Sequence, residues 1–220
     1  MIFRFVDRYL DPSETLLEVL FGLIMALTIT VGARLVSERA DIVGIELAVA
    51  LLGCNVAWGV IDGAFFLLGT IFNRNRRVQF VKRLQAAADE TQALAAVRDE
   101  FDLDGEPPMR AADKANLHSS LLQLFRHAGT ARAELRVDDW IAAALIAALV
   151  SATAIPGLIP LLVIQDGFVA LRVANVLQIG LLFFVGYWWA HYSGSNRWLV
   201  GLAIASLGTA LVLLAVPLGG

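Results

Sequence analysis

Charged residues are scarce in this sequence. Only 17% of its 220 residues are Asp, Glu, Lys or Arg, whereas a soluble domain carries about 25%. The charges are also unevenly placed and leave long neutral stretches, while 58% of the residues are hydrophobic. The mean hydropathy is +0.70. This composition excludes an ordinary soluble domain and predicts an integral membrane protein, with the lipid bilayer as its first partner.

Cysteine and histidine are also scarce. Cys54 is the single cysteine, so the chain can form no internal disulfide and has no CxxC motif. The histidines, His118, His127 and His191, lack the spacing of paired ligands, and we expect structural or surface roles for them. The sequence has no glycine-rich phosphate loop, no HExxH and no GxSxG. We therefore expect no enzyme activity, and no basic block suggests nucleic acid.

Five neutral or nearly neutral runs are long enough to cross a bilayer, which takes roughly 20 apolar residues. The first ends in small residues, as a signal-peptide cleavage site would, but Glu18 interrupts it and the charged leader is long. We therefore interpret it as a retained helix. The five runs are residues 15–33, about 44–72, 140–165, 173–190 and 198–218.

The positive charges predict an orientation. If the N-terminus is cytoplasmic, every Lys and Arg except Arg34, Arg39 and Arg172 falls on the cytoplasmic side. Because cytoplasmic loops carry an excess of positive charge, we expect a cytoplasmic N-terminus and an outside C-terminus. The compact loops favour a bacterial inner membrane over a vacuole.

The predicted fold class is all-α, with a helical cytoplasmic segment between the second and third of five transmembrane helices. Residues 1–72 should hold a helix lying in the membrane surface and the first two spans, and residues 139–220 the last three. Residues 73–138 should form a cytoplasmic helical hairpin. It begins with NRNRRVQFVKR, whose charges stop translocation and can hold lipid phosphates.

Local signals mark several helix ends. Asp11-Pro12-Ser13-Glu14 is a typical helix start, with Asp11 as the cap and Glu14 at the capping-box position. Pro156 and Gly157 should kink or end the third span. Within 73–138, apolar residues at helical spacing from Val78 through Ala88 to Ala95 predict a first helix. DLDGEPP should break it, and a second helix should run from about 109 to 128.

The second run contains an isolated carboxylate, Asp62. Cys54, Trp58 and Asp62 recur every four residues and share one helical face, with Asn55 beside them. A charged side chain in hydrocarbon costs several kcal/mol, so such residues usually face a protein interior or a watery path. Asp62 is therefore either an ion or proton site or a hydrogen-bonded carboxylate that joins helices.

The first run offers a second set of possible ligands. Glu14 and Glu18 lie one turn apart at its start, and Met25 follows on the same stripe. Two carboxylates and a thioether could admit a divalent cation. Acidic residues near a helix N-terminus are also favoured by the helix dipole alone, so a structural role stays open for both glutamates.

Several segments resemble the vacuolar iron transporter family. FGLIMALTITVG (21–32) is similar to its first-span motif, IELAVALLGCNVAWG (45–59) to its second span, and GLIPLL (157–162) to its third-span proline motif. Residues 173–211 follow the pattern of its last two helices. The resemblance implies a homodimer that moves Fe²⁺ or Mn²⁺ out of the cytoplasm in exchange for protons. The metal is cargo, so no resident cofactor is expected.

The resemblance can be carried over residue by residue. Glu46 matches a family glutamate, and Cys54 replaces a family methionine, which keeps a sulfur ligand. Phe21 stands where the family has its first-span aspartate, and Val163 stands where it has a second proline. Residues 73–138 also contain few of the glutamates that the family places in its cytoplasmic helices.

The missing aspartate leaves two main hypotheses. In the first, Glu18, Cys54 and Asp62 line the path of a divalent metal ion, with Glu46 at its far side and Asp62 alternating between metal and proton. In the second, the chain is a non-transporting assembly or regulatory protein that retains the transporter fold, its carboxylates are structural, and its hairpin binds a partner. A transporter for another small solute is a third possibility.

Overall fold

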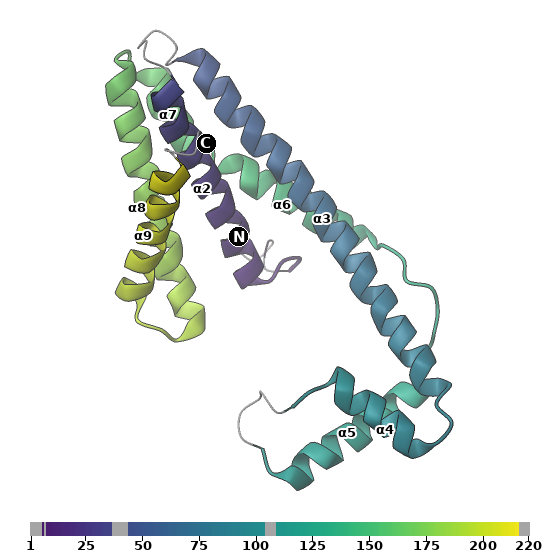
Figure 1. Cartoon of the computed structure of the whole chain (residues 1–220). Helices are drawn as coiled ribbons and strands as arrows, with labels where there is room; N and C mark the ends of the chain where they lie inside the picture. The colour runs from purple at the N-terminus through teal and green to yellow at the C-terminus, as the bar shows by residue number, and fades with distance from the viewer. Residues whose placement is uncertain (1–5, 7, 37–43, 104–108, 216–220) are drawn as a thin grey trace. The chain divides into compact units, whose positions relative to one another are not determined.

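The computed structural model describes residues 6, 8–36, 44–103 and 109–215, with the backbone alone at 33–36, 211, 212 and 215. That part of the chain is helical between its turns (Figure 1). Its helices are α2 (Pro12–Val36), α3 (Ile45–Gln85), α4 (Glu90–Glu100), α5 (Ala111–Arg126), α6 (Val137–Ala152), α7 (Ile155–Val163), α8 (Gly167–Ser193) and α9 (Arg197–Ala215).

The chain divides into two compact units. Unit 1 comprises Met1–Leu67 and Val137–Gly220, and unit 2 comprises Leu68–Arg136. Helix α3 contributes to both, because it continues from one unit into the other without a break. The predicted surface helix over residues 1–10 lies largely outside the described residues.

Four helical stretches of the described chain are long and apolar enough to cross a membrane. The prediction of a helical membrane protein is therefore confirmed. Helix α9 counts as a shorter apolar helix over Arg197–Ala210. The four long stretches are Pro12–Gly32, Ile45–Gln85, Val137–Val163 and Gly167–Ser193.

Helix α2 begins where the sequence predicted. A carboxylate oxygen of Asp11 accepts hydrogen bonds from the Ser13 amide at 2.8 Å and the Ser13 hydroxyl at 2.6 Å. The cap thus satisfies one of the first amides of the helix, which have no partner within it. Glu14, at the predicted capping-box position, lines a cavity described below.

The third predicted span is interrupted, as its prolines require. The break falls at residues 153–154, between α6 and α7, so that Pro156 lies in the first turn of α7, where a missing amide proton costs no hydrogen bond. Gly157 is buried against neighbouring helices. A β-carbon there would collide with the Gln178 amide and lie 3.1 Å from the Leu51 side chain. Helix α7 therefore packs against both α3 and α8.

The fourth predicted span, residues 173–190, was too short at its start. Helix α8 begins at Gly167, capped by Asp166, which accepts a hydrogen bond from the Val169 amide at 3.0 Å. The prediction stopped at Arg172 because of its charge. In the structure, the Arg172 guanidinium carbon lies 4.3 Å from the centroid of the Phe168 ring. This cation–π contact explains how the helix accommodates the charge.

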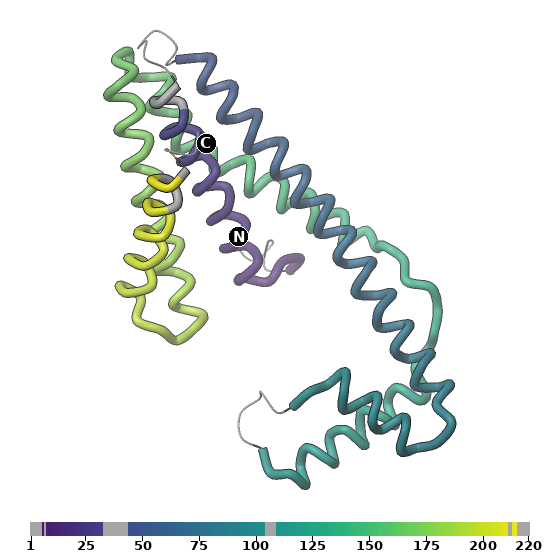
Figure 2. The backbone as a smooth tube through the Cα atoms, in the orientation of Figure 1, coloured from purple at the N-terminus to yellow at the C-terminus, as the bar shows by residue number. Residues whose placement is uncertain are grey.

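Helices α8 and α9 lie side by side and are joined by a tight turn (Figure 2). Gly194 ends α8 with a φ of 66°, the left-handed conformation that glycine adopts without strain. Further along the pair, Gly186 and Gly201 bring the two backbones close together. A β-carbon on Gly186 would lie 2.9 Å from the Cα atom of Gly201. Small residues at these positions thus allow the two helix backbones to approach closely.

Unit 2 has a core of its own, formed by the end of α3 together with α4 and α5. Phe80, Val97 and Leu122, one from each helix, are all at least 95% buried. Around them, the rings of Phe80, Phe101 and Phe125 have centroids 5.4 to 5.9 Å apart. Such edge-on and stacked aromatic pairs add stability beyond the area that they bury.

The first helix predicted within residues 73–138 was wrong in its length. Helix α3 ends at Gln85, Ala88 lies outside any helix, and Asp89 starts α4 by accepting a hydrogen bond from the Gln92 amide at 2.7 Å. The Gln92 side chain in turn accepts one from the Ala88 amide at 2.9 Å. This reciprocal cap competes with continuation of the helix. The predicted second helix corresponds to α5.

Candidate functional site: a carboxylate cavity in unit 1

Helices α2 and α3 bring three of the predicted site residues together. Glu14, Glu18 and Asp62 line one cavity of about 230 Å³ in unit 1. The cavity therefore joins carboxylates of the first and second apolar helices in a setting that is otherwise apolar. Its other lining residues are Leu17, Phe21, Phe65, Phe66 and Ile146.

Two glycines position Asp62 at this cavity. A β-carbon on Gly59 would lie 2.6 Å from the carbonyl oxygen of Ala147, and one on Gly63 would lie 2.7 Å from that of Ala143. The backbone of α3 therefore packs directly on α6 through small residues four apart on each helix, as in membrane helix pairs. Asp62 precedes Gly63 at the edge of this contact and is half-buried.

Glu18 is the most constrained of the three carboxylates. It is half-buried, and its Oε2 atom is buried without a hydrogen-bond partner in the described part of the chain. Asp62 and Glu14 line the same cavity as Glu18. A buried carboxylate oxygen without a donor is costly, and it is usually explained by function, an ion or water. Glu14 is exposed at the cavity's outer part.

The cavity offers carboxylate oxygens, which suit hard divalent cations such as Mn²⁺ and can also carry protons. It does not hold a complete set of metal ligands. Among the residues that the structure describes, no three His, Cys, Asp or Glu side chains come close enough together to hold a metal ion. A cation in this cavity would need further ligands from water or from another chain.

The other predicted ligands lie elsewhere. Glu46 is exposed in the first turn of α3, about 24 Å along the helix from Asp62 at 1.5 Å per residue. Cys54 is half-buried and lies about 12 Å from Asp62 by the same measure. Met25 lies about 10 Å beyond Glu18 along α2 and is also half-buried. None of the three lines the cavity.

A second feature of unit 1 is a set of buried polar side chains. Asn55 and Gln178 are both fully buried. The Asn55 amide donates to the Thr153 hydroxyl at 2.9 Å and to the Gly22 carbonyl at 3.2 Å. The Thr30 hydroxyl lies 3.2 Å from the Gln178 amide oxygen. These contacts tie α2, α3 and α8 together at buried positions.

Sequence reasoning missed part of this arrangement. It singled out Asn55 but not Gln178, although an isolated amide in an apolar run is a recognisable signal. It also passed over the spacing of Gly59 and Gly63, which is a known helix-packing pattern. The aromatic walls of the cavity carried no signal of their own, because phenylalanine is common in all the apolar runs.

His118 has the structural role that its spacing suggested. It is buried, and its Nε2 atom lies 2.9 Å from the carbonyl oxygen of Phe101. This contact joins α5 to the end of α4. Comparisons of the chain with protein-family models and with curated proteins found no match.

Proposed function

We propose that this chain is a membrane transporter that moves a divalent transition-metal ion, iron or manganese, out of the cytoplasm in exchange for protons. The observation that carries the proposal is the shared cavity of Glu18 and Asp62. Each comes from a different apolar helix, and Glu18 has a buried oxygen without a described partner. Ionisable groups inside membrane spans typically mark ion or proton pathways.

The resemblance to vacuolar iron transporters supports a role for this cavity in metal binding. Phe21, at the position of the family's first-span aspartate, lines the same cavity as Glu18 and Asp62. The two carboxylates therefore lie where they can replace the charge that Phe21 lacks. In this proposal they exchange metal and proton, Glu14 attracts the cation at the cavity's outer part, and Cys54 takes it further along α3.

The proposed topology has five spans. Helix α9 is the fifth, the N-terminus and unit 2 are cytoplasmic, and the C-terminus lies outside. The distribution of Lys and Arg supports this orientation. A bacterial inner membrane is the proposed location, with Glu46, at the start of α3, near the far side of the path.

The proposal includes a homodimer, because the described residues of one chain supply too few ligands for a metal ion. Two aromatic side chains of the cavity, Phe21 and Phe65, are 57% and 63% exposed on the surface of the single chain. In a two-fold dimer the same patch of both chains meets itself. Two cavities would then face each other and offer four half-buried carboxylates in place of two.

Transport can be tested in proteoliposomes that contain the full chain and a pH-sensitive dye. Addition of Mn²⁺ or Fe²⁺ should drive proton flux, and both Asp62→Asn and Glu18→Gln should reduce that flux at least tenfold. Asp99→Asn is the matched control, because Asp99 is exposed on α4 and lines no part of the cavity. Flux that is unchanged in both cavity variants would show that the site assignment is wrong.

A second function has its own supporting observation. The incomplete ligand set and the phenylalanine at position 21 both fit a protein that keeps the transporter fold without transporting. Such a protein would act in membrane assembly or regulation, with unit 2 as its partner-binding part. Calorimetry that shows no binding of Mn²⁺ or Fe²⁺ to intact dimers would favour this function over transport.

A further inference from the structure

Unit 2 contains a larger cavity that the proposed transport does not use. It has a volume of about 570 Å³, within the range of small-ligand sites. All of its lining residues belong to unit 2 and come from α3, α4 with its C-terminal cap, and α5. One side of the cavity is polar and the other is aromatic.

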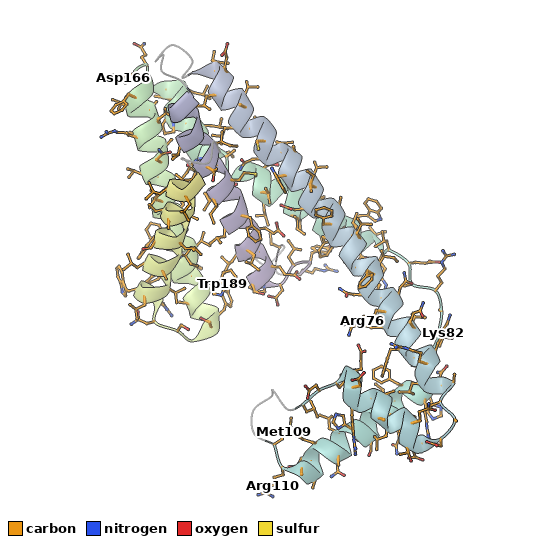
Figure 3. The ribbon with its side chains drawn as sticks, in the orientation of Figure 1. Arg76, Lys82, Met109, Arg110, Asp166 and Trp189 are labelled. Carbon is orange, nitrogen blue, oxygen red and sulfur yellow. The ribbon has the colours of Figure 1, made fainter. Side chains whose placement is uncertain are left out.

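The polar side is a single face of α3. Asn73, Arg76 and Arg77 line the cavity together with Phe80, and this spacing places all four on the same side of the helix. Phe80 is buried in the core of unit 2, so the face that packs the core continues into the cavity as one amide and two guanidinium groups. Figure 3 labels Arg76 near the end of α3.

The two arginines differ in their partners. Arg76 forms a salt bridge with Glu100, which also lines the cavity, with a nitrogen–oxygen distance of 2.6 Å. This single contact uses one of the five N–H donors of the guanidinium group. Arg77 has no carboxylate partner in the described part of the chain and is exposed. The lining therefore keeps an excess of one positive charge.

The aromatic side makes part of the cavity lining apolar. Phe101 and Phe125 stack there with ring centroids 5.7 Å apart and an interplanar angle of 17°. Paired guanidinium groups beside an amide suit a phosphate, which accepts several hydrogen bonds from a planar fork of donors. An apolar lining beside such donors suits a molecule that joins a phosphate to a hydrocarbon part.

The position of the cavity in the sequence indicates the source of the phosphate. Asn73 directly follows Phe72, the last residue of the apolar run in α3. Arg76 lies about 6 Å beyond Phe72 along the same continuous helix. When α3 spans a bilayer, the basic face therefore lies at the depth of the lipid head groups, where clustered arginines bind anionic lipids.

We propose that this cavity binds a phosphate monoester, with the head group of an anionic phospholipid as its source, and that Arg77 is the principal contact. The proposal does not depend on metal transport. It also differs from general attraction to an anionic membrane surface, since it requires particular side chains rather than any positive charge.

The test uses the full chain in detergent micelles and two probes. Dioctanoyl phosphatidic acid and inorganic phosphate are titrated separately, and their dissociation constants are measured by calorimetry. Arg77→Gln should weaken binding of phosphatidic acid at least tenfold. Arg77→Lys should cause a smaller loss, because lysine keeps the positive charge, but still some loss, because it lacks the planar fork of donors. Lys82→Gln is the matched control, since Lys82 is an exposed cation on the same helix that does not line the cavity.

The outcomes separate the possible explanations. Arg77-dependent binding of phosphatidic acid with weak binding of inorganic phosphate supports a lipid source, and equal dependence in both probes supports a phosphate site open to soluble ligands. Equal losses in Arg77→Gln and Lys82→Gln would overturn the proposal in favour of non-specific charge attraction. Unchanged binding in both Arg77 variants, with an unchanged circular dichroism spectrum, would also overturn it.

Discussion

The side-chain nitrogen of Asn55 lies 2.9 Å from the hydroxyl oxygen of Thr153, at the break between α6 and α7. Thr153 donates its own proton to the Val150 carbonyl at 2.6 Å, so its oxygen is free to accept from Asn55. The Asn55 amide thus joins α3 to the break in the third span. The Asn55 amide also donates to the Val150 carbonyl at 3.3 Å, so that a side chain of α3 pairs with a backbone carbonyl in the last turn of α6.

The first prediction concerns this contact. Asn55→Leu should lower the free energy of unfolding by about 1–2 kcal/mol, because it removes interhelical hydrogen bonds from a buried position. Thr153→Val should have a smaller effect. Unfolding in mixed micelles would measure both, and the double variant should lose less than the sum of the two single losses. Strict additivity would show that the two side chains do not act as a pair.

The second prediction concerns the glycine contact beside Asp62. Gly59→Ala and Gly63→Ala should each destabilise unit 1 by about 1–3 kcal/mol, because the new methyl group would press on the α6 backbone. Gly53→Ala, in the same helix, is the control. Its β-carbon would have no atom of the described chain within 4 Å, so alanine should stabilise the helix by about 0.5–1 kcal/mol. Similar thermal melting shifts for Gly53→Ala and Gly59→Ala would contradict the close packing.

The third prediction concerns pH at the start of α2. The Ser13 hydroxyl, and then its amide, donate to Asp11 and hold the pKa of that carboxyl below its ordinary value. A depressed pKa in the folded state contributes stability above the unfolded-state pKa, and the contribution is lost as the pH falls through the folded-state value. Carbonyl NMR titration should show a rise of the Asp11 pKa in Ser13→Ala. An unchanged value would mean that the hydroxyl bond does not stabilise the charged form.

Local signals in the sequence predicted most of the helices in unit 1. These signals depend only on residues close together in the sequence. They are the long apolar runs, the cap at Asp11 and the prolines after residue 154, and each corresponds to a helix or a helix boundary in the structure. The errors came where a local rule was applied too simply. Helix α8 begins before Arg172 despite the charge of that residue. Helix α3 ends before Ala88 although the apolar spacing continues through it.

The site was harder to predict, because it depends on which faces of two helices meet. Eight residues correspond to 2.2 turns, so Cys54 is rotated by about 80° from Asp62, and the two do not reach the same cavity. Glu18 and Asp62 belong to different helices, and the contacts of α3 with its neighbouring helices, including the close contact with α6, fix where Asp62 lies. Spacing along one helix carries no information about such a contact.

The fourth prediction restores the charge that the resemblance to vacuolar iron transporters expects at position 21, and it rests on the proposed function. Phe21 lines the cavity beside Glu18 and Asp62, so Phe21→Asp would add a third carboxylate to the two that are half-buried there. Carboxylates are preferred ligands of Mn²⁺. The variant should bind Mn²⁺ at least tenfold more tightly than the natural chain, as measured by electron paramagnetic resonance of the free ion.

Two controls separate this gain from a general effect of added negative charge. Phe72→Asp places the same charge on α3, at an exposed position that does not line the cavity, and should leave Mn²⁺ affinity within twofold. Phe21→Ala removes the ring without adding a ligand and should change affinity equally little. If Phe21→Asp binds no more tightly than Phe72→Asp, then Glu18 and Asp62 do not form part of a metal site. The carboxylates would then be structural, which is the arrangement that the non-transporting function requires.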